Sequence, residues 1–132
     1  MPSEALIQAA VSARRHAVAT YSGFKIGAAI ETAEGRVFTG CNIENASLGL
    51  TVCAERVALW KALSEGERTF TGMAVVSDSA SPATPCGACR QLLWEYCGDI
   101  PLFLHTLRGK TQTMQLADLL PEPFHRGYFS GA

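Results

Sequence analysis

The first segment of the chain has the apolar spacing of an amphipathic helix. Ser3 can cap that helix, and the turn-forming stretch 21–23 stops the chain from continuing it. Residues three or four positions apart share one face of a helix. The apolar positions of the expected helix are Leu6, Ile7, Ala10, Ala13 and Ala17. The pattern therefore predicts a helix that begins near Ser3 and reaches about Ala17.

Shorter apolar runs follow and predict strands. Residues 26–32 and 36–41 are typical of two strands, and Ala33-Glu34-Gly35 forms the turn between them, which predicts an antiparallel hairpin. Residues 72–77 form a continuous apolar run, typical of a central strand that is covered on both faces.

Two further strands are expected near the end of the chain, at residues 102–105 and 111–114. The turn at Arg108-Gly109-Lys110 joins them. A link of this length is too short for a parallel crossover, so these two strands should be antiparallel.

Helices are expected at about 52–64 and 86–98, with a short helix that ends at Pro121. The helix at 52–64 is apolar on most sides, so we expect it to be well buried. The elements therefore follow the order β-β-α-β-α-β-β after the first helix. This order predicts an α/β fold with helices on both faces of a mixed five-stranded sheet, a three-layer α/β/α sandwich.

Composition narrows the classes of function. With 132 residues, of which 48% are apolar, we expect one domain spanning 1–132 with a single core. No stretch reaches the roughly 18 unbroken apolar residues of a membrane span, and we expect no secretory signal, because the start lacks a basic region followed by an apolar core. A net charge of −1 with scattered basic residues argues against nucleic-acid binding. Five cysteines, an odd number, indicate reduced thiols in a cytoplasmic protein.

Two short segments, Cys53-Ala54-Glu55 and Pro85-Cys86-Gly87-Ala88-Cys89, carry the candidate chemistry. Their three thiols can fill three corners of a zinc tetrahedron and leave the fourth open for water, as in catalytic zinc sites. Glu55 lies two residues from a ligand, where it can handle the protons of that water. Both segments fall at expected helix starts, whose partial positive charge favours thiolates.

Three thiolates give a zinc ion an excess of negative charge. Arg56 and Arg90 directly follow Glu55 and Cys89 in the sequence. We expect at least one of these arginines to contact the sulfurs and offset that charge.

Simpler interpretations of the cysteines remain open. Cys86-Gly87-Ala88-Cys89 alone also fits a redox dithiol at a helix start. A closed four-cysteine structural zinc would need Cys41 or Cys97. Cys97 lies two helical turns beyond Cys89, about 12 Å along the axis, which is too far to share a metal on one helix. Cys41 is more simply a small buried thiol.

Together these motifs resemble the small single-domain cytidine deaminases, over roughly residues 14–124. In such deaminases a zinc ion activates a water and a glutamate transfers protons, which matches the roles inferred above for the three thiols and Glu55. The matching segments are Phe24 to Ala28, Gly40 to Ala46, Cys53 to Arg56, Ser81-Pro82, Pro85 to Gln91 and Leu119-Leu120-Pro121.

The resemblance implies a role for each matching residue. Cys53, Cys86 and Cys89 would hold one Zn²⁺ per subunit, and Glu55 would be the catalytic proton shuttle. Asn42 and Glu44 would bind the ribose hydroxyls, Phe24 would pack against the nucleoside, and the backbone at Ala54 would contact the base. Ala46 and Phe124 would reach the site of a neighbouring subunit in a homotetramer. Asn42 and Glu44 also suit an ordinary turn, and Phe24 an ordinary core position.

The implied activity is hydrolytic deamination of cytidine and 2′-deoxycytidine to uridine and 2′-deoxyuridine, with release of ammonia, in pyrimidine salvage. Relatives commonly carry an aromatic residue where this chain has Leu48, and residues 125–132 have no match. Two other functions stay open: deamination of another aminopyrimidine, such as a nucleoside antibiotic, and a thiol- or zinc-based regulatory or redox module.

Overall fold

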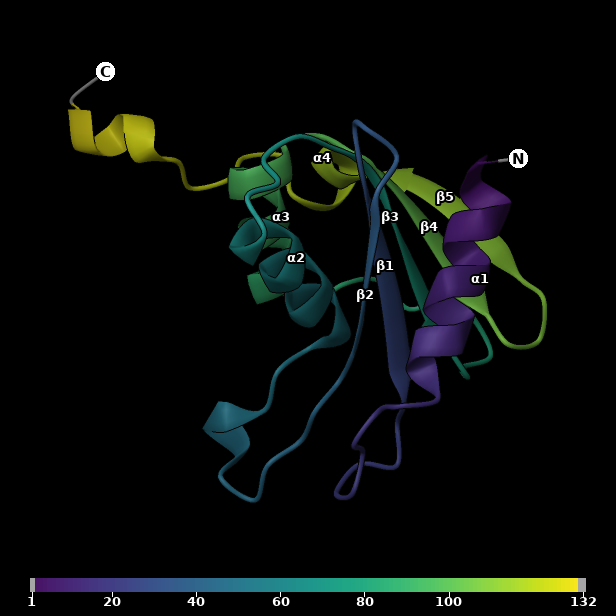
Figure 1. The fold of residues 1–132 in the computed structure, drawn as a ribbon. Helices are drawn as coiled ribbons and strands as arrows, with labels where there is room; N and C mark the ends of the chain where they lie inside the picture. Colours follow the sequence, from purple (N-terminus) through teal and green to yellow (C-terminus); the bar gives the residue numbers. More distant parts are fainter. Residues whose placement is uncertain (1, 131–132) are drawn as a thin grey trace.

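The computed structural model describes residues 2–130, whose elements are arranged around one sheet (Figure 1). The helices are α1 (Pro2–Arg14), α2 (Ala54–Ser64), α3 (Gly87–Cys97) and α4 (Leu116–Leu119), with short 3₁₀ helices η1 (Leu48–Leu50) and η2 (Arg126–Ser130). The strands are β1 (Ile26–Thr32), β2 (Val37–Cys41), β3 (Phe70–Ser77), β4 (Pro101–Thr106) and β5 (Thr111–Gln115).

The sheet is mixed, as predicted, and its strand order is β2-β1-β3-β4-β5. The hairpin β1–β2 and the pair β4–β5 are antiparallel, which confirms both expectations. β1 also pairs antiparallel with β3, whereas β3 and β4 are parallel and are joined through α3. β3 is the central strand that its apolar run predicted, and every residue from Gly72 to Ser77 is buried.

Helices cover both faces of the sheet, which confirms the three-layer arrangement. Figure 1 shows α1 on one face and α2 and α3 on the other. Alternate residues of β1 pack against the helices on the two faces of the sheet, because successive side chains of a strand point to opposite faces. Ala29 packs with Leu6, Ile7 and Ala10 of α1, while Ile30 belongs to the larger cluster on the α2 and α3 side.

Glycines in β1 and β2 allow two helices to lie directly on the strand backbone. A Cβ atom at Gly40 would lie 2.4 Å from the carbonyl oxygen of Ala54, and one at Gly27 would lie 2.1 Å from that of Ala10. Neither backbone could move away without moving its helix. Gly40 therefore sets the height of the first turn of α2, which carries the candidate chemistry, above the sheet.

The first helix is shorter than predicted, so its extension to Ala17 is wrong. α1 ends at Arg14, and residues 15–17 form a turn. The reason is a long-range pairing: Val18 forms an isolated bridge with Ile43, and its N–H donates to the carbonyl oxygen of Asn42 at 2.9 Å. A chain that continued as a helix could not make this contact.

The helix expected at 52–64 begins two residues later, at Ala54, because Cys53 has extended backbone angles and caps it. Val52 instead bridges to Ile43. In the same way Cys86 caps α3. Within residues 2–130, no helix combines the length and hydropathy that crossing a membrane requires.

Candidate metal centre and substrate pocket

The sheet topology brings the two cysteine segments together. β2 and β3 both pair antiparallel with β1, so they run in the same direction and their carboxyl ends share one edge of the sheet. α2 follows β2 and α3 follows β3 in the chain, so both helices begin at this edge. Ligand sites of α/β sheets commonly form outside such carboxyl ends.

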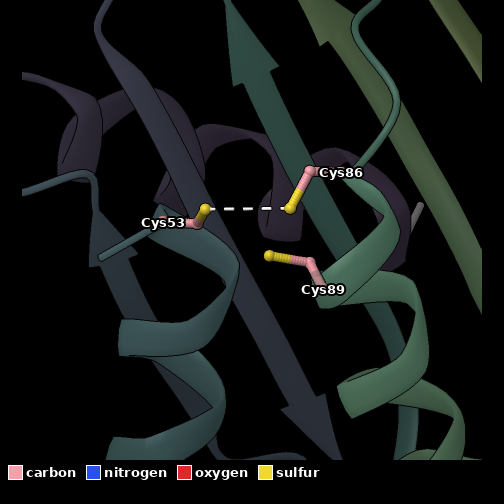
Figure 2. Close-up of side chains that lie close together, drawn as sticks. All are labelled: Cys53, Cys86 and Cys89. Atoms are coloured by element: carbon pink, nitrogen blue, oxygen red, sulfur yellow. Dashed lines mark hydrogen bonds between the residues drawn. The ribbon is translucent and has the colours of Figure 1, made fainter. Parts of the chain in front are cut away.

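Figure 2 shows the three sulfurs turned toward one another, with Cys53 at the start of α2 and Cys86 and Cys89 at the start of α3. The Sγ atoms of Cys53 and Cys86 are 4.0 Å apart, and all three sulfurs lie within 4.8 Å of one another. Cys53 and Cys86 occupy the N-cap positions, but neither thiol forms a hydrogen bond to its own helix. Both thiols can therefore face the shared space.

The three thiols fit a zinc ion in spacing and in chemistry. Zn–S bonds of about 2.3 Å in a tetrahedron place the sulfurs about 3.8 Å apart, so the observed cluster needs only a small contraction. Among residues 2–130 the cluster contains these three ligands and neither Cys41 nor Cys97. A closed four-cysteine site therefore finds no support, and a tetrahedral zinc held by these three thiols would keep one coordination position for water or substrate.

The thiols and Arg56 influence one another electrostatically. The hydrogen bond with Cys89 and the charge of Arg56 lower the pKa of the Cys53 thiol. The same pairing raises the pKa of the Cys89 thiol, because a second thiolate beside the first is unfavourable. Contact with the Cys89 and Cys86 sulfurs raises the pKa of the Arg56 guanidinium.

The two arginines differ in what they contact. Arg56 Nη2 donates to Cys86 Sγ at 3.9 Å, while its Nε is buried with no hydrogen-bond partner among the described residues. Arg90 is directed elsewhere: it donates to the carbonyl oxygens of Pro85 at 2.8 Å and Leu119 at 3.1 Å, and to Thr84 Oγ1 at 2.9 Å. Arg56 can therefore offset negative charge at the sulfurs, whereas Arg90 stabilises the loop that precedes Cys86 through hydrogen bonds.

Glu55 lies in the first turn of α2, two residues after Cys53, and is only 6% exposed. Burial, followed by the negative charge of Cys53, raises the pKa of its carboxyl to about 7. A buried carboxyl group that exchanges its proton near neutral pH suits general acid–base chemistry.

A cavity of about 230 Å³ opens over this centre. It combines six of the residues predicted for the site, namely Phe24, Asn42, Cys53, Ala54, Glu55 and Cys86. Its other lining residues include Thr51, Ala83 and Thr84, which sequence reasoning missed. These three lie in irregular segments with no periodicity or motif of their own, so nothing local in the sequence identifies them.

The remaining predicted residues lie outside the cavity. Glu44 borders an adjacent groove together with Tyr21, Ser22, Leu48 and Thr51. Ala46 lies on the exposed loop that follows. Phe124 is 56% exposed and belongs to the segment that leads away from the body of the molecule to η2 (Figure 1).

Comparison with known proteins places the chain in a family. Residues 2–101, which include all three clustered cysteines, match the cytidine and deoxycytidylate deaminase zinc-binding region. The cytidine deaminase of Halalkalibacterium halodurans is 48% identical over 125 residues, covering 94% of this chain and 95% of that protein. The crystal structure of cytidine deaminase from Burkholderia pseudomallei superposes with a TM-score of 0.90 at 48% identity, covering 94% of this chain and 100% of that one.

A more distant relative is the blasticidin-S deaminase of Bacillus cereus, 32% identical over 109 residues and covering 76% of this chain and 77% of that protein. The sequence match, the fold and the three clustered thiols agree with one another, and they are consistent with one zinc ion per chain. On this evidence, the chain belongs to the zinc-binding cytidine and deoxycytidylate deaminase family.

Proposed function

We propose that this protein catalyses the zinc-dependent hydrolytic deamination of cytidine and 2′-deoxycytidine to uridine and 2′-deoxyuridine, with release of ammonia. The observation that carries the proposal is that three clustered thiols able to hold zinc border a cavity whose lining includes Cys53, Cys86 and the buried carboxyl group of Glu55. The relatives named cytidine deaminase, at up to 48% identity over most of the chain, support the substrate class.

In this proposal Cys53, Cys86 and Cys89 are the metal ligands. Zinc, when bound, supplies a Lewis acid that makes a water at its open position easier to deprotonate. The Glu55 carboxylate accepts a proton from the attacking water and delivers it to N3 of the base as oxygen adds to C4. The same carboxyl group then moves the remaining hydroxyl proton to the amino nitrogen, which leaves as ammonia. The products are uridine and ammonia, so one water is consumed for each turnover.

Burial explains why one carboxyl group can serve twice. A pKa near 7 leaves both the protonated and the ionised form of Glu55 accessible at neutral pH. Its place in the first turn of α2, where it lines the same cavity as Cys53 and Cys86, would keep it beside the reacting atoms throughout.

The pocket walls suit a pyrimidine nucleoside. Phe24, Ile26 and Val75 offer apolar surface to the base and sugar, and the backbone at Ala54 borders the same space. Asn42 and Glu44 would contact the ribose hydroxyls, since Asn42 lines the cavity and Glu44 borders the adjacent groove that shares Thr51 with it.

We also propose that residues 1–132 act as one catalytic domain in a homotetramer of a cytoplasmic pyrimidine-salvage enzyme. Phe124 and Ala46 would then contribute to a neighbouring subunit's site. The exposed apolar side chains on η1 and the C-terminal segment support an assembly, because such side chains are commonly covered by a partner. They are Leu48, Leu50, Phe124, Tyr128 and Phe129.

A metal analysis combined with a cytidine assay tests the function. We expect about one zinc per chain, as three thiolates imply, and loss of uridine formation on chelation that added zinc reverses. Glu55→Gln should keep zinc but lose activity by about 10²–10⁴-fold, whereas Glu34→Gln, in the β1–β2 turn, should not. Full-rate deamination by the metal-stripped protein would refute the proposal.

The match to a blasticidin-S deaminase supports a second candidate class of substrate, the nucleoside antibiotics. Turnover of cytidine, free cytosine and blasticidin S by the same preparation separates the candidates. We expect cytidine to have the highest kcat/KM, because Asn42 and Glu44 would recognise an intact ribose. A strong preference for the antibiotic would reassign the function within the same chemistry.

A further inference from the structure

Ser22 occupies a position that no motif singled out, between two residues proposed to bind substrate. Its hydroxyl donates to Glu44 Oε2 and accepts a hydrogen bond from the backbone N–H of Phe24 at 3.0 Å. The proton direction is unambiguous, because an ionised carboxylate can only accept and a backbone N–H can only donate. Ser22 therefore joins the two residues through a single oxygen atom.

The carboxylate of Glu44 is held by the same turn. Its Oε1 accepts from the backbone N–H groups of Tyr21 at 2.9 Å and Ser22 at 3.0 Å. These two bonds fill the acceptor sites of Oε1, so it is Oε2, bonded to the Ser22 hydroxyl, that keeps capacity for a further donor, such as a ribose hydroxyl. Glu44 thus has a defined orientation before any substrate arrives.

Phe24 is held from its other side by Asn42. Asn42 Nδ2 donates to the carbonyl oxygen of Phe24 at 2.8 Å, and Asn42 Oδ1 accepts from the N–H of Ile26 at 2.8 Å. Both backbone polar groups of Phe24 are therefore bonded to side chains of the site.

These bonds matter because packing does not hold Phe24. Its side chain is 43% exposed, lines the cavity, and belongs to neither buried apolar cluster of the described residues. The preceding Gly23 has φ +70°, a conformation that favours glycine and turns the chain sharply. The placement of the ring therefore depends on the hydrogen bonds to its backbone.

We propose that Ser22 is a positioning residue for substrate binding, which couples the orientation of Glu44 at the ribose to that of Phe24 at the pocket wall. This inference rests on the proposed function. Ser22 does not touch the reacting atoms, so its loss affects binding of the nucleoside more than the chemical step. A group that contributes equally to ground state and transition state changes KM rather than kcat.

The test compares Ser22→Ala with Ser22→Thr, which keeps the hydroxyl, in steady-state kinetics on cytidine. Removing a hydrogen bond to a charged group should raise KM about 10-fold, with kcat changed less than about twofold. The KM of Ser22→Thr should equal that of the wild type. Ser12→Ala is the matched control: it is another exposed serine with a side-chain hydrogen bond, on α1.

A double-mutant cycle then tests the coupling itself. If Ser22 acts through Glu44, the KM effects of Ser22→Ala and Glu44→Ala should be smaller in combination than their product. Unchanged KM in Ser22→Ala, equal losses in Ser22→Ala and Ser22→Thr, or fully independent effects would each overturn the inference. Thermal unfolding and zinc content of every variant show whether a loss is merely structural.

The wild-type protein separates this inference from the proposed function. If it deaminates cytidine and Glu55→Gln does not, the function holds and the Ser22 variants decide the inference alone. If the wild type does not deaminate cytidine, both fall together.

Discussion

Gln91 holds the backbone of Phe124 with both ends of its side-chain amide. Its Nε2 donates to the carbonyl oxygen of Phe124 at 2.6 Å, and its Oε1 accepts from the N–H of Phe124 at 3.3 Å. The preceding residue, Arg90, donates to the carbonyl oxygen of Leu119. Two consecutive residues of α3, the helix that carries Cys89 of the thiol cluster, therefore attach the chain segment that leads to the C-terminal tail.

The first prediction follows from this attachment. Gln91→Ala should release the segment that carries Phe124, and so weaken any contact of that side chain with a neighbouring subunit. We expect specific activity to fall on dilution at protein concentrations where the wild type keeps its activity, together with a shift to smaller species in sedimentation. Gln8→Ala, exposed on α1, is the control. Identical dilution profiles for Gln91→Ala and wild type would contradict this role.

The second prediction concerns the metal and the stability of the fold. Cys53 and Cys86 begin different helices, so a metal bound by both ties α2 to α3. A ligand that binds only the folded state stabilises it. Cys53→Ala should therefore lower zinc well below one per chain and lower the Tm by at least about 5 °C. Cys41→Ala, outside the thiol cluster, should keep its zinc. Metal analysis measures the zinc content of both variants, and calorimetry measures their Tm.

The third prediction is a pH effect at Glu44. The hydrogen bond from the Ser22 hydroxyl, with further bonds from the backbone of Ser22 and Tyr21, lowers the pKa of the Glu44 carboxyl from its ordinary value of 4.5. A folded-state pKa below the unfolded one adds stability above pH 4.5, and this stability is lost as pH falls through the folded pKa.

Ser22→Ala should therefore raise the pKa of Glu44 toward 4.5. Carbon-13 NMR of the side-chain carboxylates measures this directly, and Ser12→Ala should leave the Glu44 titration as in the wild type. A Glu44 titration that does not respond to Ser22→Ala would mean that the hydroxyl bond is not formed in solution.

The fourth prediction tests how the site is seated on the sheet. An alanine at Gly40 would place its Cβ 2.4 Å from the carbonyl oxygen of Ala54 and 2.6 Å from the N–H nitrogen of Ala58. Overpacking of this kind costs about 1–3 kcal/mol of unfolding free energy. The forced shift of α2 should also reduce kcat/KM more than about 10-fold, because Glu55 moves with it.

Gly49→Ala provides the comparison for stability, since a Cβ there meets nothing within 4 Å. Chemical denaturation should find its unfolding free energy within about 0.5 kcal/mol of the wild type. Equal stability of Gly40→Ala and Gly49→Ala would show that the helix can move away from the strand at little cost.

Local sequence patterns determined much of this protein. The period of apolar residues identified the strands and helices, and the short turns predicted the antiparallel pairs β1–β2 and β4–β5, because both properties depend on residues close together in the chain. The candidate metal ligands were also recognisable, since Cys86 and Cys89 have the spacing of one helical turn and Glu55 follows Cys53 by two residues.

Only the tertiary structure decided which distant residues meet. The sheet order places Cys53 beside Cys86, and a separate bridge between Val18 and Ile43, outside the sheet, accompanies the early end of α1. Side-chain hydrogen bonds assign Arg56 to the sulfurs and Arg90 to carbonyl oxygens, although both follow the candidate motifs in the same way. Ser22 and Gln91 gain their roles from partners 22 and 33 positions away. Such pairings depend on the path of the whole chain, which no local period encodes.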